Sequence, residues 1–166
     1  PNRGKSHAVR MGIEAAKNEW IMMIDSDLVG LRTEDIAALV EPIRKGEAEV
    51  SLSLRKNSLR IYKWLGIDFV SGERVFKKES IGDLGILDTL PGFGLEVYLN
   101  DRFVSQKSPI AVVRWENVVT PRKSVKFGWW TGMRGDLKMI REIIAVFGIR
   151  KIKNQIQAMR VLAKLK

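Results

Sequence analysis

The feature that most constrains the fold is a run of apolar residues, 20–24, that ends in the acidic tripeptide Asp25-Ser26-Asp27. A short apolar run of this kind is typical of a strand that is buried in a sheet. Sheets of the α/β class bind ligands and metals at the carboxyl ends of their strands. Asp25 and Asp27 leave the strand two residues apart, so both carboxylates can face one divalent cation. Mg²⁺ and Mn²⁺ prefer such oxygens and share their other positions with substrate phosphates.

A simpler interpretation of the tripeptide is a turn. Asp-x-Asp pairs are frequent in loops, and an aspartate here can cap the helix that is predicted to follow. The tripeptide alone does not decide between the turn and the metal site.

The composition indicates one globular domain with an acidic partner. The chain has 166 residues, of which 45% are hydrophobic and 29% charged, enough for an ordinary core. Its net charge of +10 favours a nucleic acid, an anionic membrane or a phosphorylated substrate. The sequence has no cysteine, which rules out thiolate zinc sites and fits a reducing cytoplasm. Its single histidine, His7, lies at the start of a predicted helix, which favours a structural role over a Ser-His-Asp triad.

Hydrophobic periodicity and end signals predict alternating helices and strands, which is typical of an α/β fold. A helix that Thr33 caps is expected to follow the acidic tripeptide. The pattern predicts helices over residues 6–18, 33–46 and 95–103, and strands over 20–24, 49–54 and 111–115. No signal peptide and no apolar run of the roughly 18 to 20 residues that a spanning helix needs is apparent.

The C-terminal segment, residues 147–166, has the pattern of a basic amphipathic helix. It carries six positive charges and no acidic residue, with apolar residues spaced by three and four at Ile149, Ile152, Ile156, Met159 and Leu162. Such a helix suits an anionic bilayer surface, where each basic group contributes about 1 kcal/mol. Alternatively, the apolar stripe packs on the domain and the basic residues form a solvated face.

Four segments occur in an order that resembles a known family: Asn2-Arg3-Gly4-Lys5 with the helix after it, Asp25-Ser26-Asp27, Ser71-Gly72-Glu73-Arg74-Val75-Phe76, and Gly92-Phe93-Gly94-Leu95-Glu96. Together they resemble the family 2 glycosyltransferases with a GT-A fold, particularly the branch of dolichyl-phosphate mannosyltransferase and related polyprenyl-phosphate and phosphoglycerate glycosyl transferases. The resemblance implies a Rossmann-like mixed sheet flanked by helices.

The resemblance covers only the later part of the family's catalytic domain. The family begins with a strand, an acidic turn and a second strand that grip the nucleotide base, and these elements would precede the segments seen here. We therefore expect residues 1–127 to form the later part of a GT-A domain without its first strands. Residues 128–166 are expected to form a helical extension at a membrane surface.

The resemblance implies metal and donor contacts. Asp25 and Asp27 would hold Mg²⁺ or Mn²⁺, which neutralises the departing diphosphate. Arg3, Gly4 and Lys5 would contact the donor diphosphate at a helix start. A mobile basic loop would add further diphosphate contacts, from Arg122, Lys123 and Lys126. Surface basicity alone is the alternative for Arg3 and Lys5, and a solvated connector is the alternative for the loop.

The acceptor side is implied by two other segments. Ser71, Gly72 and Arg74 would bind the acceptor, with Arg74 holding a phosphate through two parallel hydrogen bonds. Glu96 would be the general base if the acceptor is a hydroxyl, and a positioning residue if it is an ionised lipid phosphate.

The expected activity is therefore a metal-dependent, inverting sugar transfer from a UDP- or GDP-linked donor. The expected acceptor is a polyprenyl phosphate, another membrane lipid or a hydroxyl compound, and the expected location is the cytoplasm or the inner membrane face. Two alternatives remain open. Gly4-Lys5-Ser6 before a strand that ends in Asp25 mimics a P-loop NTPase, and the positive charge with nearby aromatic residues is compatible with a nucleic-acid-binding domain, although no nucleic acid is expected.

Overall fold

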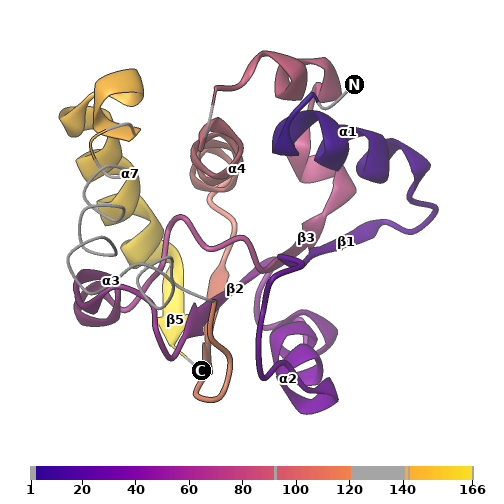
Figure 1. The fold of residues 1–166 in the computed structure, drawn as a ribbon, viewed down its shortest axis with the longest axis vertical. Helices are drawn as coiled ribbons and strands as arrows, with labels where there is room; N and C mark the ends of the chain where they lie inside the picture. The colour runs from indigo at the N-terminus through magenta and orange to yellow at the C-terminus, as the bar shows by residue number, and fades with distance from the viewer. Residues whose placement is uncertain (1–2, 92, 121–140, 142, 166) are drawn as a thin grey trace.

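The computed structural model describes residues 3–91, 93–120, 141 and 143–165, which form a mixed sheet flanked by helices (Figure 1). The strands have the spatial order β1-β3-β2-β4-β5. Their bounds are β1 Trp20–Met23, β2 Val50–Arg55, β3 Arg74–Lys77, β4 Ile110–Trp115 and β5 Ala163–Leu165. The helices are α1 Lys5–Ala15, α2 Thr33–Arg44, α3 Arg60–Leu65, α4 Gly94–Ser105 and α7 Ile149–Leu162, with two 3₁₀ helices at Lys78–Ile81 and Leu84–Thr89.

The sheet combines two antiparallel pairs with two parallel pairs. Strand β3 runs antiparallel to both β1 and β2, so that Met23 pairs with Arg74 and Leu52 also pairs with Arg74. Strands β2 and β4 are parallel, as are β4 and β5. The carboxyl ends of β2 and β4 therefore lie side by side, at the edge where α/β sheets place ligands.

Helices cover both faces of the sheet, as their apolar stripes require. On one face α2 buries Leu39 against Val75, Val113 and Trp115. On the other face α4 and α7 bury a larger cluster that includes Phe103. Figure 1 shows α2 and α4 on opposite sides of the strands.

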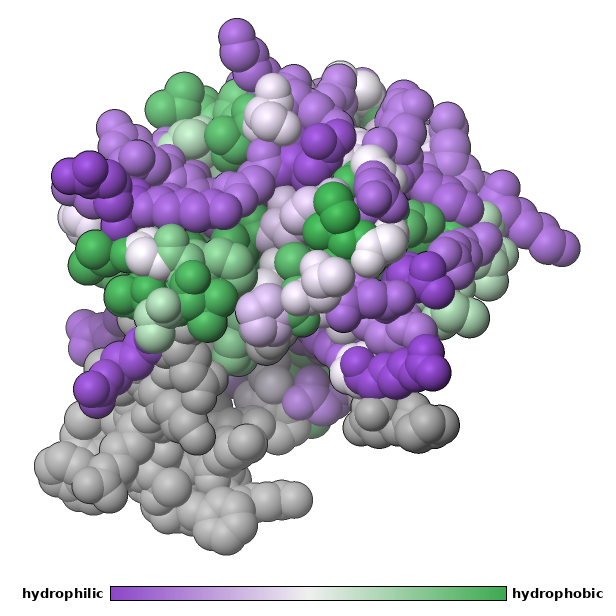
Figure 2. All heavy atoms as spheres, turned by 90° about the horizontal axis from the view of Figure 1, so that it is seen from above, coloured by the Kyte–Doolittle hydropathy of each residue, from purple (hydrophilic) through white to green (hydrophobic). Residues whose placement is uncertain are grey.

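Helix α7 packs its apolar stripe into the core. Ile152 and Met159 are buried in the larger cluster, and α7 lies against α4. The basic residues of the helix lie mainly on the opposite, exposed side. No helix in the described part of the chain is long and apolar enough to cross a bilayer. Figure 2 shows hydrophilic side chains over much of one face, with smaller groups of apolar side chains between them.

Two sequence predictions about elements are wrong. Thr33 is the first helical residue of α2 rather than its cap, and the backbone N–H of Arg32 instead donates to Asp35 Oδ2 at 3.0 Å. The C-terminal helix does not continue to the end of the chain, because Ala163–Leu165 forms β5 and pairs with Ile110, Ala111 and Val112 of β4. The exposed edge of β4 offers backbone hydrogen bonds that override the helical pattern.

Candidate active site

The candidate site lies where β1 ends. Asp25 follows the strand by two residues, and its carboxylate faces the first turn of α1, where Lys5 Nζ donates to Asp25 Oδ1 at 3.1 Å. The same ammonium donates to Glu96 Oε1 at 2.9 Å, from the first turn of α4. Lys5 therefore joins two carboxylates that lie far apart in the sequence. The positive charge between them is the ammonium group of Lys5.

The two carboxylates set the protonation of Lys5. Burial lowers the pKa of Lys5, but the charges of Glu96 and Asp25 outweigh it, so the pKa lies above its usual value. The side chain of Glu96 is 4% exposed, whereas that of Lys5 is 44% exposed. Lys5 thus stays charged near neutral pH and keeps one side open to a ligand.

Gly72 brings the turn before β3 against the Asp25 carboxylate. A Cβ atom at Gly72 would lie 2.5 Å from Asp25 Oδ1, which is closer than any real contact. Only glycine therefore lets the two segments approach this closely.

We expect Gly72→Ala to displace the Asp25 carboxylate. If that carboxylate is a metal ligand, as the sequence predicts, the variant should weaken Mn²⁺ binding by about ten- to hundredfold. Mn²⁺ titration followed by calorimetry measures the effect. Gly12→Ala is the matched control, because a Cβ there meets nothing within 4 Å. Equal Mn²⁺ affinity in the two variants would show that the contact between Gly72 and Asp25 is unimportant.

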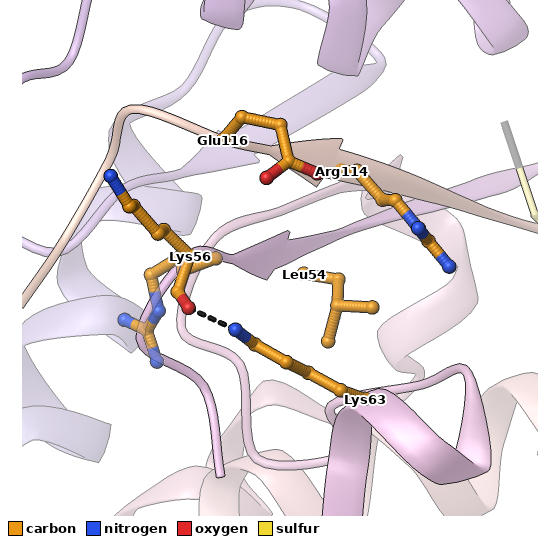
Figure 3. A pocket seen from close by; sticks show the side chains of 6 residues that line it. Leu54, Lys56, Lys63, Arg114 and Glu116 are labelled. Carbon is orange, nitrogen blue, oxygen red and sulfur yellow. Dashed lines mark hydrogen bonds between the residues drawn. The ribbon is translucent and has the colours of Figure 1, made fainter. Parts of the chain in front are cut away.

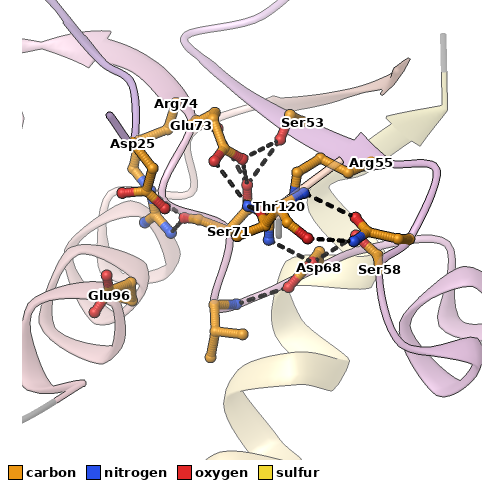
Figure 4. Close-up of polar contacts among 12 residues, drawn as sticks. Asp25, Ser53, Arg55, Ser58, Asp68, Ser71, Glu73, Arg74, Glu96 and Thr120 are labelled. Carbon is orange, nitrogen blue, oxygen red and sulfur yellow. Dashed lines mark hydrogen bonds and ion pairs between the residues drawn. The ribbon is translucent and has the colours of Figure 1, made fainter. Parts of the chain in front are cut away.

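Arg74 is fully buried behind Gly72, and its guanidinium is held within the protein. Its Nε donates to the carbonyl of Ser71 at 3.0 Å, a second nitrogen also donates to that carbonyl, and a third donates to Asn100 Oδ1 at 3.2 Å. Burial lowers the pKa of Arg74, while Glu96 is the first of several carboxylates that raise it. Figure 4 shows Arg74 beside Asp25 and above Glu96.

Asn100 connects Arg74 to the C-terminal helix. Its Nδ2 donates to the carbonyl of Phe69 at 2.7 Å and to Gln155 Oε1 at 3.4 Å. Gln155 in turn donates to the carbonyl of Val97 at 2.9 Å and to Asp101 Oδ1 at 2.6 Å. Helix α7 therefore supports the candidate site through one continuous set of buried hydrogen bonds.

We expect Gln155→Leu to lower the free energy of unfolding by about 1–3 kcal/mol, because the Asn100 side chain and the carbonyl of Val97 lose a partner in a buried place. Urea unfolding measures the change. Gln157→Leu is the control, since Gln157 lies on the same helix but is exposed. A loss no larger than that of the control would mean that the buried amide contributes nothing.

Glu73 anchors the other side of the Ser71-Gly72 segment. Its Oε2 accepts from Ser53 Oγ at 2.6 Å and from Ser71 Oγ at 2.9 Å. Its Oε1 accepts from Arg55 at 2.8 Å (Figure 4). Glu73 is 0% exposed, so these partners are what make its charge tolerable.

The loop after Asp27 is also fixed. Val29 and Val119 form a two-bond antiparallel bridge, with N···O distances of 2.9 and 3.0 Å. Gly30, with φ +83°, lies so close to the carbonyl of Asn117 that a Cβ would be 2.5 Å from its oxygen. The chain that carries the acidic tripeptide is thus tied to the segment that follows β4.

The structure brings several of the predicted site residues together. Asp25, Lys5, Glu96, Gly72 and Arg74 form one cluster, and the carbonyl of the buried Ser71 accepts from Arg74 within it. Asp27 and Arg3 are exposed, and Gly4 precedes α1 with φ +88°. Arg122, Lys123 and Lys126 lie outside the described residues. Sequence reasoning missed Glu73, Asn100 and Gln155, whose buried polar character does not show in a single sequence.

The chemistry of this cluster fits a divalent cation. Among the described residues, no group of three potential metal-binding side chains converges. Mg²⁺ and Mn²⁺ do not need such a cage, because one or two carboxylates plus substrate phosphates suffice. Asp25 already faces a positive charge, and its side chain remains 31% exposed.

The fold is similar to solved structures of glucosyl-3-phosphoglycerate synthase from Mycobacterium tuberculosis. The complex with Mn²⁺, UDP and phosphoglyceric acid matches with a TM-score of 0.61 and 19% identity, over 92% of this chain and 54% of that chain. The complex with phosphoglyceric acid matches with a TM-score of 0.57 and 23% identity, over 74% and 49%. The chain therefore spans about half the length of these proteins. This likeness defines a GT-A fold, as the sequence predicted.

Residues 1–84 match the family model described as glycosyl transferase family 2. The chain belongs to this family. No curated protein matches it.

Proposed function

We propose that the protein transfers a sugar from a nucleotide-diphosphate donor to an acceptor, in a metal-dependent and inverting reaction. The observation that carries this proposal is the Asp25 carboxylate at the end of β1, with Lys5 at 3.1 Å and Gly72 packed against it, in a chain of glycosyl transferase family 2. Another similar structure of glucosyl-3-phosphoglycerate synthase was solved with Mn²⁺ and UDP-glucose, which supports such a donor. In the proposed donor, the sugar is linked to UDP or GDP.

Asp25 and Asp27 would hold Mg²⁺ or Mn²⁺, which when bound neutralises charge on the leaving diphosphate. Lys5 offers a second positive charge at the start of α1, where helix N–H groups also favour phosphate. Arg3 and Gly4 lie next to it, and the basic residues Arg122, Lys123 and Lys126 complete the proposed diphosphate contacts. The raised pKa of Lys5 keeps this charge in place near neutral pH.

Glu96 is the proposed base. Its carboxylate is buried, and Lys5 holds it at 2.9 Å beside Arg74 and Asp25. With a hydroxyl acceptor, Glu96 takes the proton as the acceptor oxygen attacks the sugar carbon and the diphosphate leaves. With an ionised phosphate acceptor no proton needs to move, and Glu96 then orients Lys5.

The proposed acceptor carries a phosphate. Arg74 supplies a fixed positive charge beside Asp25 and holds the Ser71-Gly72 turn, which would line the acceptor side. The similar structures contain phosphoglyceric acid or glycerol 3-phosphate. A polyprenyl phosphate would present a phosphate to the same site, but there the phosphate oxygen itself would attack the sugar carbon. Such a lipid acceptor would place the protein on the inner face of the membrane, with the exposed basic side of α7 toward the anionic lipid.

The test is titration of Mn²⁺ with UDP and with GDP into the chain. Paramagnetic broadening of the backbone amides of Lys5 and Gly72 shows where the ion binds. We expect broadening at both amides, and binding of one nucleotide only when Mn²⁺ is present. A folded chain that shows neither would contradict the proposal. Transfer assays with UDP-glucose and each acceptor then separate small phosphates from lipid phosphates.

A further inference from the structure

A second group of cations surrounds a pocket at the carboxyl ends of β2 and β4, and none of them belongs to the cluster of Asp25, Lys5 and Glu96. The pocket has a volume of about 220 Å³ and is lined by Leu54, Arg55, Lys56, Lys63, Arg114 and Glu116. In Figure 3 the labelled charged side chains surround Leu54. The sheet edge formed by these strand ends is the one at which α/β folds bind ligands.

Arg114 breaks the burial pattern of its strand. The other residues of β4 are buried, and Arg114 alone is exposed. It pairs in register with Leu54 of β2 and continues the row of Ile110 and Val112, which lie in the large core cluster. An otherwise apolar strand thus places a guanidinium at the pocket, where an apolar side chain would have extended the core.

Lys63 reaches the same pocket from α3. Its Nζ donates to the backbone carbonyl of Lys56, as the dashed line in Figure 3 shows. This bond uses one of the three donors of the ammonium and holds the side chain over the pocket. The other two donors remain for a ligand.

The charges of the lining do not cancel. Arg55 is paired with Glu73 at 2.8 Å. Among the described residues, neither Lys56, Lys63 nor Arg114 forms an ion pair with a carboxylate, and Glu116 is the one acidic residue of the lining. Three cations therefore face one carboxylate. A small anion would offset the repulsion between them.

We propose that this pocket binds a phosphate group, independently of the metal and of the donor nucleotide. Guanidinium and ammonium groups are the usual ligands of phosphate oxygens, and the guanidinium can bind two of them at once. The small volume and the carboxylate of Glu116 select a single phosphate group over an extended polyanion. The phosphate can belong to a free phosphorylated compound or to a lipid headgroup.

The test uses inorganic phosphate and pyrophosphate with the whole chain, in EDTA, without nucleotide, and against chloride at equal ionic strength. Calorimetry gives the affinity, and the amide shifts of Lys56 and Arg114 give the place. Loss of one charge-assisted hydrogen bond typically costs a factor of about ten. We expect Lys63→Gln with Arg114→Gln to weaken binding at least tenfold. Lys17→Gln with Lys107→Gln, an equal change in charge at exposed positions, should have little effect.

Vesicles of phosphatidylcholine with and without phosphatidic acid form the second arm. The proposal is supported if the pocket variant loses binding to free phosphate or to phosphatidic acid while the control variant keeps it. The ligand whose binding is lost identifies the source of the phosphate. Equal losses in the pocket variant and the control would overturn the proposal, as would no binding in either arm. Urea unfolding confirms that both variants are folded. Metal and nucleotide are absent from this test. A negative result would therefore contradict the phosphate pocket without contradicting the proposed sugar transfer.

Discussion

Asp25→Asn should abolish metal-dependent binding of the nucleotide and lower the rate of sugar transfer by at least about 10²-fold. The neutral amide keeps the shape of the side chain but removes the charge that faces Lys5 at 3.1 Å. Loss of one preorganised electrostatic partner of a transition state typically costs about 10²- to 10³-fold in turnover. Calorimetric titration with Mn²⁺ and UDP measures binding, and single-turnover assays measure transfer. Asp27→Asn should act in the same direction.

Asp83→Asn is the control for this experiment. Asp83 is exposed and accepts a hydrogen bond from the backbone N–H of Gly85, which an asparagine oxygen can also accept. The variant carries the same change in charge away from the candidate site. If Asp25→Asn binds Mn²⁺ and nucleotide as well as Asp83→Asn does, the proposed metal site is wrong.

Arg55→Met should lower the free energy of unfolding by about 3–5 kcal/mol, the cost of removing one partner from a buried ion pair. Arg55 donates to Glu73 Oε1 at 2.8 Å and lies 3.7 Å from Asp68 Oδ2. Both carboxylates are buried, and the variant removes the cation that is paired with them. Urea unfolding at neutral pH measures the loss. Arg44→Met is the control, because it removes the same group from an exposed pair with Glu41 and should change little.

The loss in Arg55→Met should depend on pH. Burial raises the pKa of Asp68 in the folded protein, and Arg55 is the first of the groups that oppose this rise. Removing Arg55 therefore raises the folded pKa further above the unfolded value. A carboxyl group with a raised folded pKa costs stability above that pKa and regains it on protonation. The destabilisation should thus be largest at neutral pH and shrink as the pH falls. A pH-independent loss would exclude Asp68 as its source.

The sequence predicted the parts of the site that local patterns determine. The apolar run before Asp25 identified a strand and its carboxyl end, and the order of motifs identified the GT-A fold. It could not predict that Lys5 joins Asp25 to Glu96, because that contact depends on how α1 and α4 pack on the sheet. The direct placement of Gly72 on Asp25 is likewise a tertiary contact.

The polar support of the site was even less accessible from the sequence. Asn100 and Gln155 are ordinary polar residues of amphipathic helices until the fold buries them. Periodicity also favoured a helix through residues 163–165, where backbone pairing with β4 produces a strand instead. In each case the deciding partner is distant in the chain and leaves no local signal.

The pairing of β5 with β4 has a consequence for how the protein folds. These strands are parallel and lie far apart in the sequence, so the chain must close a long loop before their first hydrogen bond forms. Only the hydrogen bonds of the three β5 residues then offset the entropy cost of closing that loop. We expect this edge to form late, after α7 has docked on α4, and to open before the centre of the sheet. Hydrogen exchange should therefore be faster at β5 than at the amides between β2 and β4.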